Sequence, residues 1–191
     1  MKIGILSDSH HKNEYLKECI EFLKKENCEY LIHAGDICSK DGLDILKNSN
    51  LKYIAVFGNN DRDLSQFAQD YNIKKEPYYF KIKDKSFKLM HLPFHLHPDT
   101  DIIIFGHTHK FDCEYKNKKL FHVLYYNILK HWMCLTVYMR TDSIVCTVVL
   151  LNTTRRRVSM AASQLGEGVG AENKPQKYLY HVSYTRSSGG F

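Results

Sequence analysis

The chain opens with short apolar runs that alternate with longer amphipathic segments. The apolar runs have the length of strands, whereas residues 12–26 place apolar side chains at helical spacing with Lys and Glu on the opposite face. This alternation predicts an α/β domain whose parallel strands are joined by right-handed helical crossovers. The expected strands are residues 2–6, 29–33 and 52–57, and the expected helices are residues 12–26, 40–47 and 63–70.

After these segments, alternation of apolar and polar residues replaces helical spacing. Residues 78–83 and 86–92 alternate in this way and flank Asp84-Lys85, which predicts a hairpin with a two-residue turn. Residues 101–105 are almost entirely apolar and predict a buried strand. A second hairpin is expected further on, with strands at 112–116 and 119–123. The front of the chain is therefore expected to be α/β first and β-rich second.

Residues 122–191 differ in character from the rest of the chain. They contain two apolar runs, at 123–139 and 143–151, but no helical period, internal repeat or chemical motif. Arg outnumbers Lys five to three there, whereas Lys outnumbers Arg eighteen to one before residue 122. We expect a domain over residues 1–121, followed by a divergent basic tail that forms either a few strands or an unfolded segment.

The net charge of +6 is distributed unevenly between residues 1–121 and residues 122–191. Residues 1–121 carry 19 basic and 18 acidic side chains, whereas residues 122–191 carry 8 and 3. Almost all the excess positive charge therefore lies in the tail, and a basic surface for nucleic acid is not supported for the front of the chain. The run Arg155-Arg156-Arg157 is interpreted as a solvated stretch of charge.

Cysteine spacing and hydropathy exclude several other classes of protein. The six Cys residues form no C-x-x-C pair, which argues against a structural zinc site or a thioredoxin-type motif. No signal peptide is recognisable at the start, and no apolar stretch reaches the roughly 20 residues that a membrane helix needs. We expect a cytoplasmic protein with reduced thiols and no membrane partner.

Five short polar motifs each follow a predicted strand. Because sites in open α/β sheets are assembled from loops at the carboxyl ends of strands, we expect these loops to converge on one crevice. The glycines within them permit sharp turns of the backbone. The motifs are Asp8-Ser9-His10, Gly35-Asp36, Gly58-Asn59-Asn60-Asp61, His91 and Gly106-His107-Thr108-His109.

Together the five loops supply two carboxylates, one amide oxygen and four imidazoles. This set is too large for one tetrahedral zinc ion, but it suits two adjacent cations with five or six ligands each. Two cations about 3.5–4 Å apart are a standard device for displacement at phosphorus. One carboxylate must bridge them, and we expect this to be Asp36. The predicted metal ligands are Asp8, His10, Asp36, Asn59, His91, His107 and His109.

In this order, the motifs D-S-H, G-D, G-N-N-D, H and G-H-T-H resemble those of the calcineurin-like metallophosphoesterase superfamily, and within it the small YfcE-like phosphodiesterase branch. The resemblance covers residues 1 to about 121. It implies a four-layer α/β/β/α sandwich and a small phosphoester substrate, hydrolysed by a hydroxide that bridges two metals. Position by position, it assigns one metal to Asp8, His10, Asp36 and His109, and the other to Asp36, Asn59, His91 and His107.

Three departures from the family pattern refine this expectation. A proton-donating His often follows the metal-binding Asn, but Asn60 stands there and can only donate a hydrogen bond to substrate. Phosphodiesters or activated esters are therefore favoured over monoesters with poor leaving groups. Only fifteen residues separate His91 from His107, so a helix between them is expected to be short or absent. The Asn-Pro-Gly segment that closes the second sheet is missing after Phe121. The closing strands are therefore expected to be altered or missing, through a frameshift or a fusion.

The ligand set also bears on the identity of the metal and on the alternative function. Mixed carboxylate, amide and imidazole ligands favour Mn²⁺, with Fe²⁺, Co²⁺, Ni²⁺ or Zn²⁺ as alternatives. Because fold does not fix function, the alternative is a non-catalytic scaffold for protein interaction with the phosphoesterase fold. Such scaffolds lose metal ligands, and the presence of all seven favours the enzyme.

Other polar residues near the motifs are interpreted as structural. His33 interrupts an apolar strand and is expected to be buried in the core or behind the site. Asp61 is expected to accept hydrogen bonds, and Asp63 to cap the helix that follows it. His95 and His97 form an H-x-H pair, but the prolines on either side favour a surface loop over a metal site.

Overall fold

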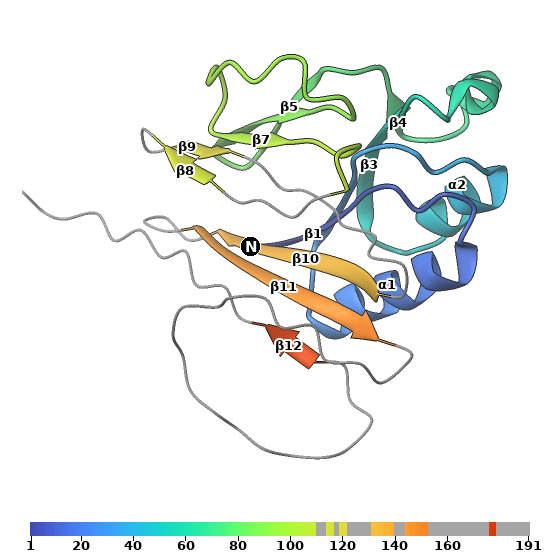
Figure 1. The fold of residues 1–191 in the computed structure, drawn as a ribbon, viewed down its shortest axis with the longest axis horizontal. Helices are drawn as coiled ribbons and strands as arrows, with labels where there is room; N and C mark the ends of the chain where they lie inside the picture. The colour runs from blue at the N-terminus through green and yellow to red at the C-terminus, as the bar shows by residue number, and fades with distance from the viewer. Residues whose placement is uncertain (110–113, 117–118, 122–130, 140–143, 153–175, 179–191) are drawn as a thin grey trace, which may run out of the picture.

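The structure is a computed structural model in which two β-sheets lie against each other, with helices on one side (Figure 1). It describes residues 1–109 in full and, as backbone strands, residues 114–116, 119–121, 131–139, 144–152 and 176–178. Within these residues, no helix is long and apolar enough to cross a membrane.

The larger sheet has seven strands in the order β12-β11-β10-β1-β2-β3-β4. Its centre is the parallel set that the sequence predicts, in which β1 pairs with β2, β2 with β3, and β3 with the two-residue β4. The bounds of these strands are β1 (Lys2–Leu6), β2 (Tyr30–His33), β3 (Lys52–Val56) and β4 (Ile73–Lys74). All four point the same way, so the loops that follow them gather at one edge.

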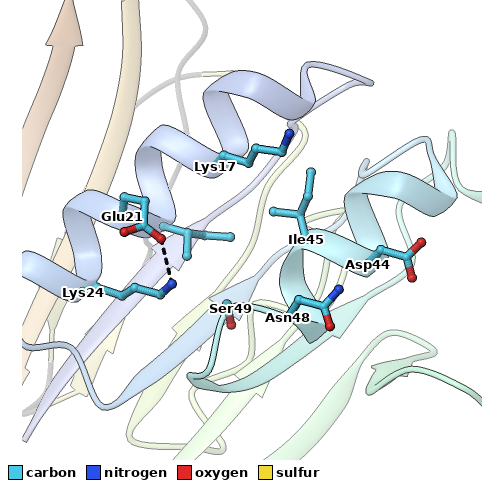
Figure 2. A pocket seen from close by; sticks show the side chains of 8 residues that line it. Lys17, Glu21, Lys24, Asp44, Ile45, Asn48 and Ser49 are labelled. Atoms are coloured by element: carbon cyan, nitrogen blue, oxygen red, sulfur yellow. Dashed lines mark hydrogen bonds and ion pairs between the residues drawn. The ribbon is translucent and has the colours of Figure 1, made fainter.

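Two α-helices, α1 (Asn13–Lys25) and α2 (Lys40–Lys47), form the crossovers and pack against each other. The Ser39 hydroxyl caps α2 by accepting a hydrogen bond from the Gly42 N–H at 3.0 Å. Between the helices lies a groove of about 290 Å³, where an ion pair joins Lys24 and Glu21 of α1 (Figure 2). None of the predicted metal ligands lines this groove.

The third predicted helix, at 63–70, is instead a short 3₁₀ helix (Arg62–Phe67). Asp61 stands at its N-cap position, and Asp63 lies within its first turn. The prediction that Asp63 caps a helix is therefore wrong. The Asp61 side chain makes no cap hydrogen bond to this helix. Its carboxylate instead accepts hydrogen bonds from the Cys38 and Gly58 N–H groups.

The smaller sheet has five strands in the order β5-β6-β7-β9-β8. The predicted hairpin between the first two is present, but its turn is Lys83-Asp84 rather than Asp84-Lys85, with Lys83 at a φ of 54°. Strands β6, β7 and β9 run parallel. The strand bounds are β5 (Tyr78–Ile82), β6 (Lys85–Leu89), β7 (Ile102–Ile104), β8 (Glu114–Lys116) and β9 (Lys119–Phe121).

The main core includes apolar side chains from both sheets. Alternate residues of β6 and β7, such as Phe87, Leu89 and Ile102, join Ile3 and Ile5 of β1 in one buried cluster. Burying each such side chain contributes roughly 1.5–3 kcal/mol to folding. The same alternation places Met90 and Ile103 in a separate cluster with Phe105, on the other face of the five-stranded sheet.

This outer face is covered by the loop that follows His91, and not by a helix. Lys88, which pairs in register with Ile103, is fully buried, and its ammonium donates to the carbonyls of His95 and His97 and pairs with Asp99. The α/β class and the two facing sheets are confirmed, and among residues 1–109 the α-helices are α1 and α2 alone. The shortened segment between His91 and His107 explains why a loop replaces a helix here.

Strands from the last third of the chain extend the seven-stranded sheet. β10 (His131–Met139) pairs antiparallel with β1, β11 (Ile144–Asn152) with β10, and β12 (Gln176–Tyr178) with β11. The tail was expected to form either a few strands or an unfolded segment, and over these three ranges it forms strands. Residues 155–157 lie outside the described residues, and the domain boundary at residue 121 stays a prediction.

Candidate metal centre

The seven predicted ligands all lie in loops at the carboxyl ends of strands, where the two sheets meet. Asp8 and His10 follow β1, Asp36 follows β2, and Asn59 follows β3. The five-stranded sheet contributes the other three residues, with His91 after β6, and His107 and His109 after β7. The convergence that the sequence predicts is therefore present.

One cluster gathers around the Asp8 carboxylate. Asp8 Oδ1 lies 3.7 Å from His10 Nε2 and 3.4 Å from His109 Nε2. The two imidazole rings stack on each other with their centroids 5.4 Å apart. The ligand atoms of these three residues lie within 4.8 Å of one another, so a single cation could contact all of them.

A second cluster gathers around Asp36 and His91. Asp36 Oδ2 lies 3.4 Å from His91 Nε2, and His91 Nε2 lies 3.0 Å from Asn59 Oδ1. The His107 ring stands edge-on to the His91 ring at a centroid distance of 5.2 Å. Asp36 Oδ2 is also 3.8 Å from His10 Nδ1, so this one carboxylate faces both clusters.

The centre has a buried floor and an open mouth. Asp8, Asp36 and His91 are almost completely buried, His10 and His109 are half-buried, and Asn59 and His107 are exposed. A ligand entering from solvent would therefore meet Asn59 and His107 first. The carboxylates at the floor are shielded from water, which strengthens their attraction for a cation.

The donor set fits a divalent cation, because a buried anionic oxygen lacks a partner. Asp8 Oδ1 accepts no hydrogen bond among the residues described, although its partner oxygen Oδ2 accepts from the Ser7 hydroxyl and from the His107 N–H. A buried carboxylate oxygen without a partner is costly. The imidazoles beside it are oriented so that a cation could satisfy this oxygen and the ring nitrogens together.

The backbone at five of the seven positions is in the left-handed region. The φ angles are 54° at Asp8, 42° at His10, 57° at Asp36, 67° at His107 and 52° at His109. Such conformations each cost free energy for a residue with a side chain, and they concentrate at functional sites. Hydrogen bonds between loops sustain them, including one from the Asp8 N–H to the Gly35 carbonyl at 2.9 Å.

Gly58 allows the β3 loop to approach Asp36 closely. A Cβ atom on Gly58 would lie 2.1 Å from Asp36 Oδ1 and 2.3 Å from the Asp36 backbone nitrogen. No side chain fits there, so glycine is required by contact rather than by its own φ. The G-N-N-D motif thus brings Asn59 close to Asp36, and the two residues are predicted to bind the same metal.

The hydrogen bonds of the floor set the charges of Asp36 and His91. Burial by itself raises the pKa of Asp36, but hydrogen bonds from His91 and Asn60 outweigh it and hold the pKa well below its usual range. Burial lowers the pKa of His91, but its bonds to Asp36 and to the Ala34 carbonyl outweigh it and leave the pKa raised. Asp36 is therefore a firm anion.

His91 also shows which ring nitrogen faces the centre. Its Nδ1 lies 2.8 Å from the Ala34 carbonyl oxygen, which can only accept a hydrogen bond, so we place a proton on Nδ1. The Nε2 atom, which faces Asp36 and Asn59, is then the one available to a metal. A neutral ring that carries its proton on Nδ1 is the form that metals prefer.

The structure gives Asn60 a different contact from the predicted one. Its side-chain amide donates to Asp36 Oδ2 at 2.6 Å and its backbone N–H donates to Asp36 Oδ1 at 2.9 Å. Asn60 is exposed at the mouth of the centre, so its predicted role in substrate binding stays a prediction.

Of the other residues considered from the sequence, Asp61 and the loop at 95–97 make hydrogen bonds, whereas His33 is buried without one within the described residues. Asp61 is buried and holds the Cys38 and Gly58 N–H groups at 2.7 and 2.8 Å, while burial raises its pKa. His33 is fully buried, and neither ring nitrogen has a hydrogen-bond partner within the described residues. The backbone carbonyls of His95 and His97 accept from Lys88, in keeping with a loop.

Two residues near the centre carry no signal in the sequence. Cys38 Sγ lies 3.6 Å from His10 Nδ1, and Cys38 groups with Asp36 and Asp61 as a further set of close ligand atoms. Glu76 accepts hydrogen bonds from the backbone of His91 and Leu92. Neither belongs to a motif, and only the folded arrangement brings Glu76 to His91.

Comparison with known proteins agrees with this geometry. Residues 1–127 match the calcineurin-like phosphoesterase superfamily domain. Phosphodiesterase MJ0936 of Methanocaldococcus jannaschii is 33% identical over 123 residues, which cover 58% of this chain and 74% of that protein.

Solved structures extend the comparison. A novel archaeal phosphodiesterase has a TM-score of 0.66 and 26% identity, covering 78% of this chain and 99% of its own. Vacuolar protein sorting 29 from Cryptosporidium parvum has a TM-score of 0.67 over 97% of this chain and 98% of its own, but at 17% identity it supports the fold alone. With a family match over residues 1–127 and ligand groups suited to a divalent metal, the chain belongs to the calcineurin-like phosphoesterase superfamily and is a metal-dependent phosphoesterase.

Proposed function

We propose that the chain hydrolyses phosphodiesters with two divalent cations, preferably Mn²⁺, held between its two sheets. The position of Asp36 carries this proposal. Its Oδ2 atom lies 3.8 Å from His10 Nδ1 and 3.4 Å from His91 Nε2, so one carboxylate faces an imidazole of each cluster. That arrangement suits a carboxylate shared by two cations.

Each cation would take four of the seven side chains, with Asp36 common to both. Bound cations at such a site supply an activated water at neutral pH and neutralise charge on the phosphoryl oxygens. The mixture of carboxylate, amide and imidazole donors is the reason for preferring Mn²⁺. The first cation is assigned to Asp8, His10, Asp36 and His109, and the second to Asp36, Asn59, His91 and His107.

The protein's own contribution is to hold these side chains in place. Ser7 and the His107 N–H fix one oxygen of Asp8, which directs its other oxygen toward His10 and His109. Asn60 fixes both oxygens of Asp36 through its side chain and its backbone. Ligands that are already oriented lose little conformational entropy when the cations bind.

The preference for diesters rests on Asn60. This residue is exposed at the mouth beside Asp36, where a His could protonate a departing alkoxide. An amide donates a hydrogen bond but no proton at neutral pH. Substrates whose leaving group departs without a proton are therefore favoured. The scaffold alternative predicts lost ligands, and the gathering of all seven favours catalysis.

The test compares an activated diester with a monoester whose leaving group is poor. The purified chain is expected to hydrolyse bis-p-nitrophenyl phosphate faster than glycerol 2-phosphate when Mn²⁺ is present, and to lose activity in EDTA. Asp36→Asn should lower kcat/KM by roughly 10²-fold or more, since it removes the negative charge that the two cations would share. Asp70→Asn, at an exposed aspartate, is the matched control.

Two results would contradict the proposal. Faster hydrolysis of the monoester would overturn the diester preference. Binding of Mn²⁺ without hydrolysis of either ester would contradict the catalytic role and favour a non-catalytic scaffold.

A further inference from the structure

Glu76 makes an unusual contact with the backbone of a predicted metal ligand. It lies between β4 and β5, and its Oε2 atom accepts hydrogen bonds from two consecutive N–H groups, those of His91 and of Leu92, the latter at 2.9 Å. One carboxylate oxygen therefore holds the main chain at the point where the loop leaves β6. Bonds to an ionised acceptor are roughly twice as strong as those between neutral groups.

The position of His91 explains why such an acceptor is needed. The pairing of β5 with β6 ends at Tyr78 and Leu89, two residues before His91, so this strand pair supplies no carbonyl for the His91 N–H. His91 is 0% exposed, so water does not reach its N–H. A buried N–H without a partner would cost the full desolvation penalty of that group. Glu76 removes this penalty.

His91 is tied at every other polar group as well. Its carbonyl accepts from the Gly106 N–H at 3.1 Å, and its ring Nδ1 donates to the Ala34 carbonyl at 2.8 Å. Glu76 completes the set by holding the N–H. With these three groups fixed, the ring presents Nε2 to Asp36 at 3.4 Å and to Asn59 at 3.0 Å.

The ligands of the seven-stranded sheet use a different device. The Asp8 N–H donates to the Gly35 carbonyl at 2.9 Å, and the His10 N–H donates to the Asp36 carbonyl at 3.0 Å. Those bonds run from main chain to main chain, so no side-chain substitution removes them. The His91 N–H depends on the side chain of a residue that is fifteen positions away.

We propose that Glu76 is a positioning residue for His91. By holding the His91 backbone, Glu76 sets the affinity of the second cation without contacting that cation. This rests on the proposed function, in which His91 is a ligand of that cation. Truncation of Glu76 would free the backbone of His91 and Leu92 and let the imidazole leave the position that suits the cation. The first cation, which does not use His91, would be unaffected.

The test is calorimetric titration of the full-length chain with Mn²⁺. Glu76→Ala is expected to weaken binding of one cation by about 10- to 100-fold, which is the range for residues that orient metal ligands, and to leave the other unchanged. Glu76→Gln keeps one acceptor oxygen and should recover most of the affinity. Lys75→Ala, at the exposed neighbouring residue, is the control.

A double-mutant cycle separates positioning from general damage to the fold. In a His91→Ala background, which is expected to lose the second cation, Glu76→Ala should leave the affinity for the remaining cation unchanged, because the ligand that it positions is gone. If Glu76→Ala does not fold, the same cycle with Glu76→Gln should show a smaller loss that again disappears without His91.

The outcomes distinguish this inference from the proposed function. Unchanged affinity for the second cation in folded Glu76→Ala, or a loss of affinity for the first cation that persists in the His91→Ala background, would overturn the positioning role alone. If the unaltered chain binds no Mn²⁺, the proposed function fails and the positioning role fails with it.

Discussion

The two halves of the metal centre are held together by different means. The half on the seven-stranded sheet, with Asp8, His10, Asp36 and Asn59, is joined mainly through its own loops. The half on the five-stranded sheet, with His91, His107 and His109, is held by contacts that cross to other elements. The first half is thus organised locally, whereas the second is positioned against it.

Main-chain bonds tie the loops of the first half to one another. The Asp8 and His10 N–H groups donate to carbonyls of the β2 loop, and the Asp61 carboxylate links that loop to the β3 loop through Cys38 and Gly58. Three loops thereby become one unit. Parallel strands next to each other in the sheet make this possible, because their carboxyl ends are neighbours.

The second half is anchored to residues of the first half and to Glu76. The His107 N–H donates to Asp8 Oδ2 at 3.2 Å, and His91 Nδ1 donates to the Ala34 carbonyl at 2.8 Å. Damage to the joined loops of the first half should therefore disturb both cations, whereas a change at one anchor of the second half should disturb mainly the cation that the anchored residue is assigned to.

The largest effect is expected at Gly58, in the first half. A Cβ there would meet the backbone and carboxylate of Asp36 at 2.3 and 2.1 Å, and neither can move without breaking the joined loops. Gly58→Ala should lower the free energy of unfolding by about 3 kcal/mol and abolish binding of both cations. Urea unfolding and Mn²⁺ titration measure the two effects.

Gly106→Ala is the matched change in the second half. Its Cβ would lie 2.1 Å from Ser7 Oγ, 2.8 Å from the Ala34 carbonyl oxygen and 2.9 Å from Asp8 Oδ2. Rotation of the Ser7 side chain would relieve the closest contact, at the cost of its hydrogen bond to Asp8. The loss of stability should be smaller than for Gly58→Ala, and binding of at least one cation should survive. Equal losses at the two glycines would contradict the asymmetry.

A smaller effect, visible only as pH changes, is expected at His33, which ends β2 just before Ala34. Burial, together with the nearby His91, lowers the pKa of His33 from 6.5 to about 3. As the pH falls below 6.5, the unfolded chain binds a proton at His33 that the folded chain does not bind until about pH 3. The contribution of neutral His33 to the free energy of unfolding is therefore fully present above pH 6.5 and is lost as the pH falls from 6.5 towards 3.

Replacement of His33 by Leu should remove this dependence. In EDTA, the free energy of unfolding of His33→Leu should fall less steeply between pH 6 and pH 4, by up to about 1.4 kcal/mol per pH unit. Unfolding in urea at several pH values measures the slope, and His11→Ala, at an exposed histidine, is the control. An identical slope in His33→Leu would contradict the burial of a neutral His33.

The candidate ligands could be predicted from the sequence because each of them directly follows a strand that is itself visible in the local pattern. Each predicted ligand follows a short apolar run, and strands such as 2–6 and 52–56 are set by residues that are neighbours in the chain. The ligands could therefore be placed at strand ends, and hence together, without knowledge of the fold. The same reasoning placed Asp61 as an acceptor.

Features that depend on distant residues could not be predicted in this way. Glu76 meets His91 only through the fold, and Lys88 sits in an alternating strand whose outer face is covered by a later loop. A lysine at that position would ordinarily indicate an exposed face. The pairing of β10 with β1 likewise joins residues more than a hundred positions apart, so no local pattern reveals it.

The number of Mn²⁺ ions bound per chain tests the central claim most directly. Equilibrium dialysis followed by metal analysis should give two ions for the unaltered chain and one for His91→Ala, because only the second cation uses that residue. A single ion in the unaltered chain, or two retained by His91→Ala, would contradict a centre in which both sheets share a pair of metals.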